Sequence, residues 1–413
     1  MGDAVVAPRA AYQHANFRRW QLARLSSIVG NQMLSVAIGW YVYDLTKSPL
    51  QLGNVGAAAF VPAFAFSLAA GHLADRLDRK RIVLAYYAVV AACSLALLLL
   101  ARAHVRAVWP ILLVSFCMGT ARTFSGPAAA ALLPSLVPTE HFGNAVAWNS
   151  VTWQVATILG PALGGLVYAL TRGAQGVFAG SFALMLVALA LASRLSPRPL
   201  EGSRPAATLD AVFAGVRYVF RHQEILGSIT LDLFAVLLGG ATALLPIYAS
   251  DVLHVGAAGL GVLRSAPAVG AGLTALVVAH RPMARRAGAW MFGGVFVFGV
   301  ATIVFALSRS FLLSLAALAV LGAADMVSVV VRQMLLQLRT PDEVRGRVAA
   351  VNLVFVGASN ELGEWESGAT AAWLGVVPAA AAGGVGTLVV VTACALLFPK
   401  LRKLDRIVAR HAS

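Results

Sequence analysis

The sequence predicts an all-α membrane protein with twelve transmembrane helices in two six-helix bundles. Three observations support this: the composition, the number of long apolar stretches and the distribution of Lys and Arg. Of 413 residues, 59% are apolar and 12% are charged, whereas soluble domains contain about 45–50% and about 25%. A single soluble core could not bury so many apolar side chains, so we expect a bilayer around the chain.

Twelve apolar stretches are each long enough to cross the hydrocarbon core, which requires ~20 residues per helix. Most are separated by short turns. They lie near residues 20–44, 50–73, 82–101, 107–131, 142–170, 175–195, 225–250, 257–280, 288–307, 310–336, 345–374 and 376–398.

The longest connection, residues 196–224, divides the predicted bundles 1–195 and 225–413. It begins with Pro and Arg residues and then becomes amphipathic. Thr208 is a plausible N-cap, and apolar residues follow at helical spacing, with arginines beside them. We therefore expect a cytoplasmic linker with an amphipathic helix on the membrane surface, and a basic cytoplasmic tail after the second bundle.

Basic residues are distributed very unevenly between the two predicted sides of the membrane. With a cytoplasmic N-terminus, 23 of the 32 Lys and Arg residues lie in inner segments and five in outer segments. The positive-inside rule therefore predicts a multi-pass protein of the cell inner membrane with both termini in the cytoplasm. This pattern explains the net charge of +15 without a nucleic-acid partner, and no cleavable signal peptide is expected.

The two halves resemble repeats of each other. The basic turn 71–81 has a counterpart at 281–286, and residues 138–147 align loosely with 340–349. Two six-helix halves joined by a long inner linker are typical of a secondary transporter with its site between the halves. Motifs for ATP use or hydrolysis are missing, and the three Cys and eight His show no metal spacing, so we expect no enzyme activity, cofactor or metal.

The most specific motif lies in the turn after the second predicted span. It reads Gly-His-Leu-Ala-Asp-Arg-Leu-Asp-Arg-Lys-Arg over residues 71–81. A glycine permits close helix approach, and an acid at the membrane boundary can face the positive N-terminal end of a neighbouring helix. We interpret this turn as a gating latch, and the alternative is a basic turn that only sets orientation. The gating residues are Gly71, Asp75, Arg76, Arg79 and Lys80.

This segment resembles the loop signature of the major facilitator superfamily, Gly-x-x-x-Asp-Arg-x-Gly-Arg-Lys, with Asp78 in place of the second glycine. Residues 122–130 resemble its fourth-helix motif, with Ser125 for Gln and Ala128 for Gly. Residues 160–165 resemble the C-terminal half of its fifth-helix antiporter motif, although Asn149 and Ala156 replace the upstream glycines. The resemblance implies a twelve-helix transporter that alternates access by rocking two bundles.

Two further stretches, residues 264–270 and 359–368, resemble the enterobactin-exporter-like branch of that superfamily. This closer resemblance implies efflux of siderophores or drugs by proton antiport.

Charged residues within the predicted spans are the candidates for substrate binding and proton coupling, because a central charge costs about 2.5–3.5 kcal/mol on insertion scales. Adjacent carboxyl groups such as Glu361 and Glu364, three residues apart on one helix face, favour protonation of each other. Alternatively, Arg122 snorkels to the cytoplasm and some acids lie in water at the outer mouth, as we expect for Glu366. Arg332 is interpreted as an orientation residue. The candidates are Arg122, Asp232, Asp325, Glu361 and Glu364.

The fifth predicted span carries a second candidate moving part. Gly160 and Pro161 predict a bend, since proline removes a helix hydrogen bond, and Gly164 and Gly165 predict a close helix contact. The alternative is ordinary helix packing, because Gly and Pro are common in membrane helices.

We therefore expect a secondary transporter that exports a small organic molecule, siderophore-like or aromatic, by proton antiport. The alternatives are a broad-range multidrug exporter of the same fold, a nutrient importer, or a non-transporting membrane assembly factor. The expected partners are a small-molecule substrate, protons and the lipid bilayer, with the chain acting as a monomer.

Overall fold

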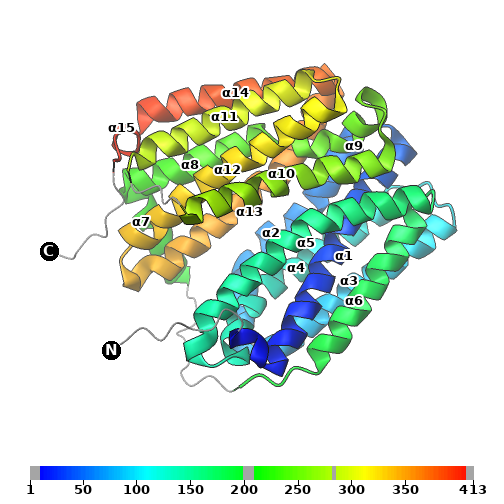
Figure 1. Cartoon of the computed structure of the whole chain (residues 1–413), viewed down its shortest axis with the longest axis horizontal. Coiled ribbons are helices and arrows are strands. Elements are labelled where there is room, and N and C mark those ends of the chain that lie inside the picture. Colours follow the sequence, from blue (N-terminus) through cyan, green and yellow to red (C-terminus); the bar gives the residue numbers. More distant parts are fainter. Residues whose placement is uncertain (1–9, 199–208, 281–284, 406–413) are drawn as a thin grey trace. The chain divides into compact units, whose positions relative to one another are not determined.

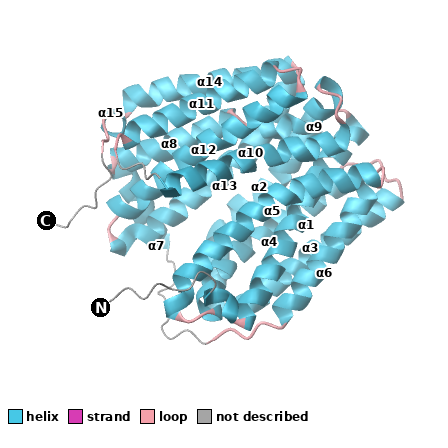
Figure 2. Ribbon diagram, viewed as in Figure 1, coloured by secondary structure: helices cyan, strands magenta, loops and turns pink. Residues whose placement is uncertain are grey.

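The computed structural model describes residues 10–198, 209–280 and 285–405. Within them, the side chains of 67–69, 71–76, 209–214, 342–343, 350 and 358 are not described. In the described part every regular element is helical and no strand occurs (Figure 2). This confirms the predicted all-α class.

Most of the helices follow one another with short connections (Figure 1). Short 3₁₀ turns lie at Ala10–Gln13, Leu133–Leu136, Thr139–His141 and Ala241–Leu244, and a π-helical turn lies at Tyr248–Val252. The α-helices are α1 Ala15–Thr46, α2 Pro49–Arg76, α3 Arg79–Arg102, α4 Trp109–Leu132, α5 Phe142–Leu170, α6 Ala174–Ser193, α7 Leu209–Arg221, α8 Gln223–Leu238, α9 Leu245–Ile247, α10 Gly256–His280, α11 Ala287–Leu307, α12 Phe311–Arg339, α13 Asp342–Leu374, α14 Val376–Leu397 and α15 Pro399–Arg402.

Residue contacts divide the chain into two compact units. Unit 1 comprises Met1–Tyr41 and Val61–Ala206, and unit 2 comprises Val42–Phe60 and Ala207–Ser413. The tip of the α1–α2 hairpin, residues 42–60, therefore packs with the C-terminal half of the chain. The predicted halves 1–195 and 225–413 with a linker at 196–224 stay a prediction.

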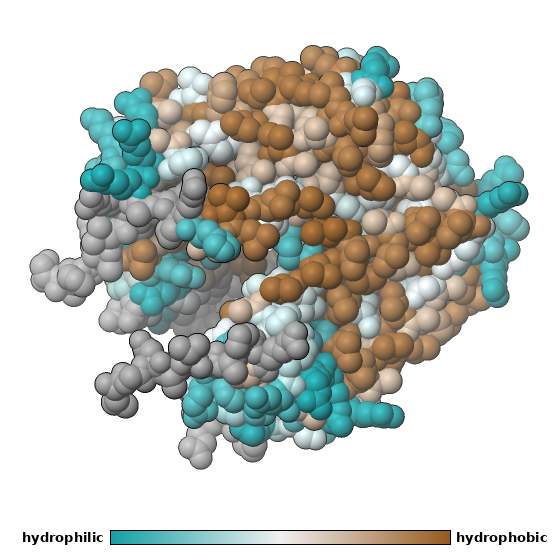
Figure 3. All heavy atoms as spheres, viewed as in Figure 1, coloured by the Kyte–Doolittle hydropathy of each residue, from teal (hydrophilic) through white to brown (hydrophobic). Residues whose placement is uncertain are grey.

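Nine helical segments of the described chain are long and apolar enough to cross a membrane. Helices α1, α4 and α13 have comparable lengths of 32, 24 and 33 residues but are not among these nine. The count of twelve spans thus stays a prediction. Large apolar side chains face outward on both units (Figure 3), including Trp373 at 91% exposure and Leu170 at 73%. Such extensive apolar surface is suited to lipid.

The predicted span 225–250 is not one continuous helix. Helix α8 ends at Leu238, and a 3₁₀ turn, the short α9 and a π-helical turn follow. The break has a local cause, because Gly239 and Gly240 have low helix propensity. Gly240 also approaches α13 closely: a Cβ atom there would lie 2.9 Å from the Gly363 carbonyl oxygen. The broken helix thus allows close backbone contact with α13.

The predicted amphipathic helix is present as α7, although its proposed N-cap Thr208 lies outside the described residues. Part of its apolar face packs within unit 2. Val219 is buried in a cluster with Leu336 of α12 and Val348 of α13. A Cβ at Gly215 would lie 2.9 Å from the Arg347 carbonyl oxygen, so α7 packs directly against the start of α13.

The N-terminal 3₁₀ turn of unit 1 is attached to the start of α5. The Ala11 amide donates to Asn144 Oδ1 at 3.1 Å, and His14 Nε2 lies 2.9 Å from His141 Nδ1. Partial burial, the neighbouring His141 and the positive charge of Arg198 together lower the pKa of His14.

This contact should weaken in acid. Because the folded-state pKa of His14 lies below its ordinary value of 6.5, the contact stabilises the fold above about pH 6.5 and loses that effect as the pH falls through the lowered value. Hydrogen exchange of amides 10–14, corrected for intrinsic rates, should therefore accelerate between about pH 7.5 and 5.5. His14→Gln should abolish this dependence. Equal protection at both pH values in the unmodified protein would contradict the assignment.

Candidate proton and substrate site

Helix α12 carries three polar side chains along one of its own faces, inside unit 2. Asp325, Ser328 and Arg332 follow one another at spacings of three and four residues, so they lie along one stripe of the helix. Asp232 of α8 faces this stripe, since it shares a small pocket with Asp325 and Ser328. Two of the predicted acids are therefore brought together by the fold.

The buried ion pair of this site joins Arg332 Nη1 to Asp232 Oδ2. Arg332 is 3% exposed and Asp232 is 5% exposed. Removing two ions from water costs several kcal/mol each, which their mutual attraction offsets only while both are present. We expected Arg332 only to set the orientation of the chain, and this prediction did not include its contact with Asp232 across the α8–α12 interface.

The pocket beside this pair has room for about one water molecule. Its polar lining consists of Asp232, Asp325 and Ser328, and its remaining lining is apolar. Ser328 Oγ is buried without a hydrogen-bond partner in the described chain, and no ion pair of Asp325 occurs among the described residues. Among the described residues, Asp232 is thus paired with a cation, whereas Asp325 is not. The apolar lining is Ala235, Val236, Val295 and Phe298.

The predicted glutamates of α13 form a separate group in unit 2. Glu361 and Glu364 are both half-buried, and Glu364 interacts electrostatically with Arg264 of α10. A Cβ at Gly56 of α2 would lie 2.8 Å from Glu364 Oε2, so Glu364 also packs against the hairpin tip. Glu366 accepts a hydrogen bond from Thr370 on its own helix, at 2.8 Å.

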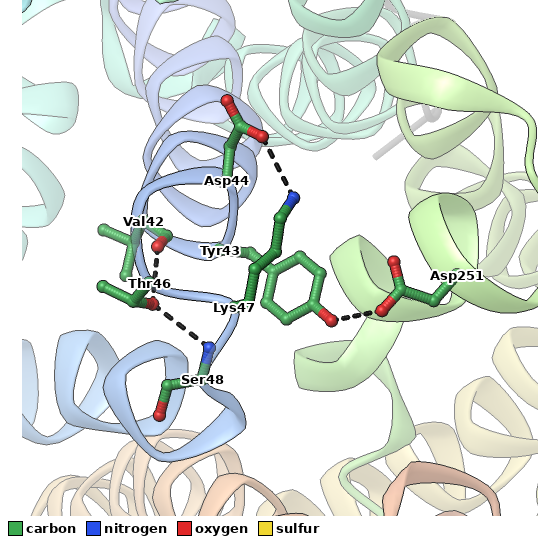
Figure 4. A network of polar contacts seen from close by, with 7 residues as sticks. All are labelled: Val42, Tyr43, Asp44, Thr46, Lys47, Ser48 and Asp251. Atoms are coloured by element: carbon green, nitrogen blue, oxygen red, sulfur yellow. Dashed lines mark hydrogen bonds and ion pairs between the residues drawn. The ribbon is translucent and has the colours of Figure 1, made fainter.

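The hairpin tip makes another polar contact within unit 2, which sequence reasoning missed. The Tyr43 hydroxyl donates to Asp251 Oδ2 in the π-helical turn, while neighbouring Lys47 pairs with Asp44 at 3.0 Å (Figure 4). Tyr43 and Asp251 lie 208 residues apart. No sequence pattern predicts a pairing between residues so far apart. At most, the phenolic hydroxyl of Tyr43 within an apolar stretch indicates that this side chain needs a polar partner.

Arg122 lies on an exposed part of α4 in unit 1, where it interacts electrostatically with the Tyr86 hydroxyl of α3. The predicted part of Arg122 in substrate binding or proton coupling stays a prediction. The cation that contacts Asp232 in the structure is Arg332.

Of the predicted latch, Gly71, Asp75 and Arg76 lie outside the residues whose side chains the structure describes. The departure at Asp78 is explained. Its carboxylate caps α3 by accepting from the Lys80 amide at 2.9 Å, and its φ of −60° is open to any residue. The turn needs no glycine there, and aspartate supplies an N-cap instead.

The other two predicted gating residues, Arg79 and Lys80, bind helix C-termini within unit 1. Arg79 Nη1 donates to the Ala131 carbonyl at 3.3 Å. Lys80 Nζ donates to the carbonyls of Ser193 and Leu195, both at 2.8 Å. Cations are favoured at helix C-termini, where carbonyl groups lack helical partners. These residues thus tie the start of α3 to the ends of α4 and α6.

The predicted glycine contact of α5 is made with α1. A Cβ at Gly160 would lie 2.5 Å from Gln32 Cβ, and one at Gly164 would lie 2.9 Å from Met33 Cα. Pro161 and Gly165 are buried in the same helix. The two backbones therefore approach more closely than side chains would allow. Whether this contact moves during transport stays a prediction.

The described residues contain no group of three or more His, Cys, Asp or Glu side chains placed to hold an ion. The cysteines are Cys93, Cys117 and Cys394, all free thiols.

Comparison with known proteins decides the family. Residues 6–412 match the family model described as "Transmembrane secretion effector". The chain belongs to this family. The enterobactin exporter EntS of Shigella boydii serotype 18 is 27% identical over 398 residues, covering 94% of this chain and 93% of the relative. The Citrobacter koseri EntS is 28% identical over 400 residues, with the same coverage.

Solved transporter structures confirm the major facilitator fold. A bacterial homologue of the human lysosomal transporter Spinster, inward-facing and occupied, aligns with a TM-score of 0.72 at 15% identity, covering 96% of this chain and 97% of that chain. A bacterial homologue of the iron transporter ferroportin, inward-facing, aligns with a TM-score of 0.67 at 16% identity, covering 94% and 99%. At these identities the likeness concerns the fold alone.

The buried ion pair should behave as a unit in stability measurements. Asp232→Asn or Arg332→Met alone leaves one buried charge without its partner, which typically costs about 3–5 kcal/mol. The double variant should recover most of this loss. The measurement is the unfolding free energy in detergent micelles, with Lys47→Met as the control for an exposed pair. Additive losses in the double variant would show that the two residues do not depend on each other.

The α5–α1 contact gives a second expectation. Gly164→Leu should reduce transport at least tenfold or destabilise the protein, because overpacking typically costs about 1–3 kcal/mol. Gly143→Leu is the matched control, since a Cβ at this position of the same helix meets no atom within 4 Å. Vesicle transport and thermal melting should be measured for both. Wild-type behaviour of Gly164→Leu would refute a tight interface.

Proposed function

We propose that the chain exports a small organic molecule, siderophore-like or aromatic, across the cell inner membrane by proton antiport. The family description names secretion, and similar relatives are enterobactin exporters. The carrying observation in the structure is the pocket that holds a paired carboxylate, Asp232, beside a second acid, Asp325.

The proton carrier in this proposal is Asp325. Ionising a carboxyl group within a membrane protein is costly unless a cation or hydrogen-bond donors stabilise the charge. Arg332 supplies that stabilisation to Asp232, so Asp232 stays ionised. Asp325 has Ser328 Oγ and space for one water nearby but no ion pair in the described chain. It can therefore gain and lose a proton during the cycle.

The glutamates of α13 have a secondary place in the proposal. Glu364 interacts electrostatically with Arg264, whereas Asp232 is paired with Arg332. Glu361, one turn away, shares a helix face with Glu364. We assign this group to the substrate pathway and to the contact with Gly56 of the hairpin tip.

The proton gradient supplies enough energy for such export. One charge moving through 100 mV provides about 2.3 kcal/mol before the pH gradient is added. The proposal includes both termini in the cytoplasm and function as a monomer.

A broad-range drug exporter of the same fold would use the same pocket with a less selective cavity, and export of many unrelated compounds would distinguish it. Uptake in place of efflux would indicate a nutrient importer. Loss of all transport with a retained cellular phenotype would indicate a non-transporting assembly factor.

Asp325→Asn should separate the two transport modes. Proton-driven export from inverted vesicles should fall at least tenfold, while substrate counterflow persists, because exchange requires no net proton movement. Glu366→Gln should preserve both modes, since Thr370 already satisfies that side chain. Asp232→Asn should lower both modes through destabilisation.

The proposal fails if proton-driven export and counterflow decline together in Asp325→Asn at normal expression and melting temperature. It also fails if both modes remain at the wild-type level.

A further inference from the structure

Helix α7 has two faces with different surroundings. One face packs inside unit 2, where Val219 is 1% exposed and lies in an apolar cluster with residues of α8, α12 and α13. The opposite face is open: Arg217 and Arg221 are exposed, and Phe220 between them is 62% exposed. Because Arg217 lies three and four residues before the other two, all three side chains share one stripe of the helix. We call these three residues the open face of α7.

The open face lies at the level where the long helices of unit 2 end (Figure 1). The Tyr218 hydroxyl donates to the carbonyl of Arg339, the last residue of α12, at 3.0 Å. A Cβ atom at Gly215 would lie 2.9 Å from the carbonyl oxygen of Arg347, near the start of α13. Because α12 is long and apolar enough to cross a bilayer, its end marks the membrane boundary, where phospholipid headgroups lie. These contacts therefore hold the open face within reach of headgroups.

Positive charge on the open face has no partner within the described chain. The ion pairs of the described residues include neither Arg217 nor Arg221. Glu224, at the start of the next helix, is already paired with Arg339 at 3.5 Å. Guanidinium groups bind phosphate oxygens through paired hydrogen bonds, while an exposed aromatic ring beside basic residues is typical of a helix that rests on the headgroup region. The chemical complement of this face is thus a phosphate group attached to apolar chains, with a net negative charge because a zwitterionic headgroup already carries its own cation.

We propose that Arg217, Phe220 and Arg221 form a docking surface for anionic phospholipids. The guanidinium groups bind the headgroup phosphates, and the Phe220 ring enters the boundary between headgroups and acyl chains. A soluble anion would satisfy the arginines but leave this ring in water, so lipid fits the whole face better. The bound lipid stabilises α7 and, through Tyr218, the end of α12. This inference concerns other residues than the transport pocket, and it holds whether or not the chain exports anything.

The test measures hydrogen exchange of amides 215–222 in the full chain, in nanodiscs of phosphatidylcholine and in nanodiscs that also contain phosphatidylglycerol. Phosphatidylglycerol should slow this exchange several-fold in the wild-type protein, since each arginine near an anionic surface contributes about a fivefold preference. The double variant Arg217→Gln/Arg221→Gln should exchange equally in both lipids. The matched variant Lys400→Gln/Lys403→Gln, which removes two exposed charges on and beside α15, should respond as wild type. Phe220→Ser should exchange faster in both lipids and keep part of the response.

Equal exchange of the wild-type protein in the two lipids would overturn the inference, and so would a full response in the arginine variant at normal melting temperature. Loss of the response in the lysine variant would also overturn it, because the effect would then reflect net charge alone. Inorganic phosphate or polyglutamate, added to phosphatidylcholine nanodiscs, should not slow the exchange. If either did so, the open face would bind a soluble anion and not lipid.

Discussion

The architecture of unit 2 depends on the buried pair of Arg332 and Asp232. Each ion alone would be expensive to hold among apolar helices, so α8 and α12 must stay in register for the pair to persist. The same contact determines the chemistry next to it. Because Asp232 already has a cation, we propose the neighbouring Asp325 as the carboxyl group that carries the proton. The structural ion pair and the proposed proton carrier are thus two consequences of one arrangement.

Close backbone contacts are the second constraint. In a bilayer, helices gain little from apolar burial against one another, and small residues at crossings provide the packing. Gly164 brings α5 onto α1 in unit 1, and Gly53 and Gly368 bring the hairpin tip onto α13 in unit 2. Within unit 2, α10 and α12 cross at Gly270 and Gly322, where an added Cβ would collide with backbone atoms.

The fold was predictable because its signals are local and additive. Three signals can be recognised without knowledge of tertiary contacts: the length of the apolar stretches, the asymmetry of Lys and Arg, and the 71–81 motif. The helix break at Gly239 and Gly240 was missed because the span was predicted from the length of its apolar stretch. That criterion ignores the effect of two glycines and a later proline on the helix. Asp232 and Asp325 were found because charges within apolar stretches are conspicuous. The difference between their environments was not predicted. Arg332, the partner of Asp232, lies 100 residues further along the chain and was interpreted as a helix-end residue.

The central claim is that Asp325, and not Asp232, changes its protonation state near neutral pH. Infrared difference spectroscopy during a pH titration in nanodiscs measures this directly, because a protonated carboxyl group gives its own C=O stretching band. The account predicts a titrating band in the wild-type protein that Asp325→Asn removes and that Glu366→Gln retains. A band that persists in Asp325→Asn and disappears in folded Asp232→Asn would contradict it.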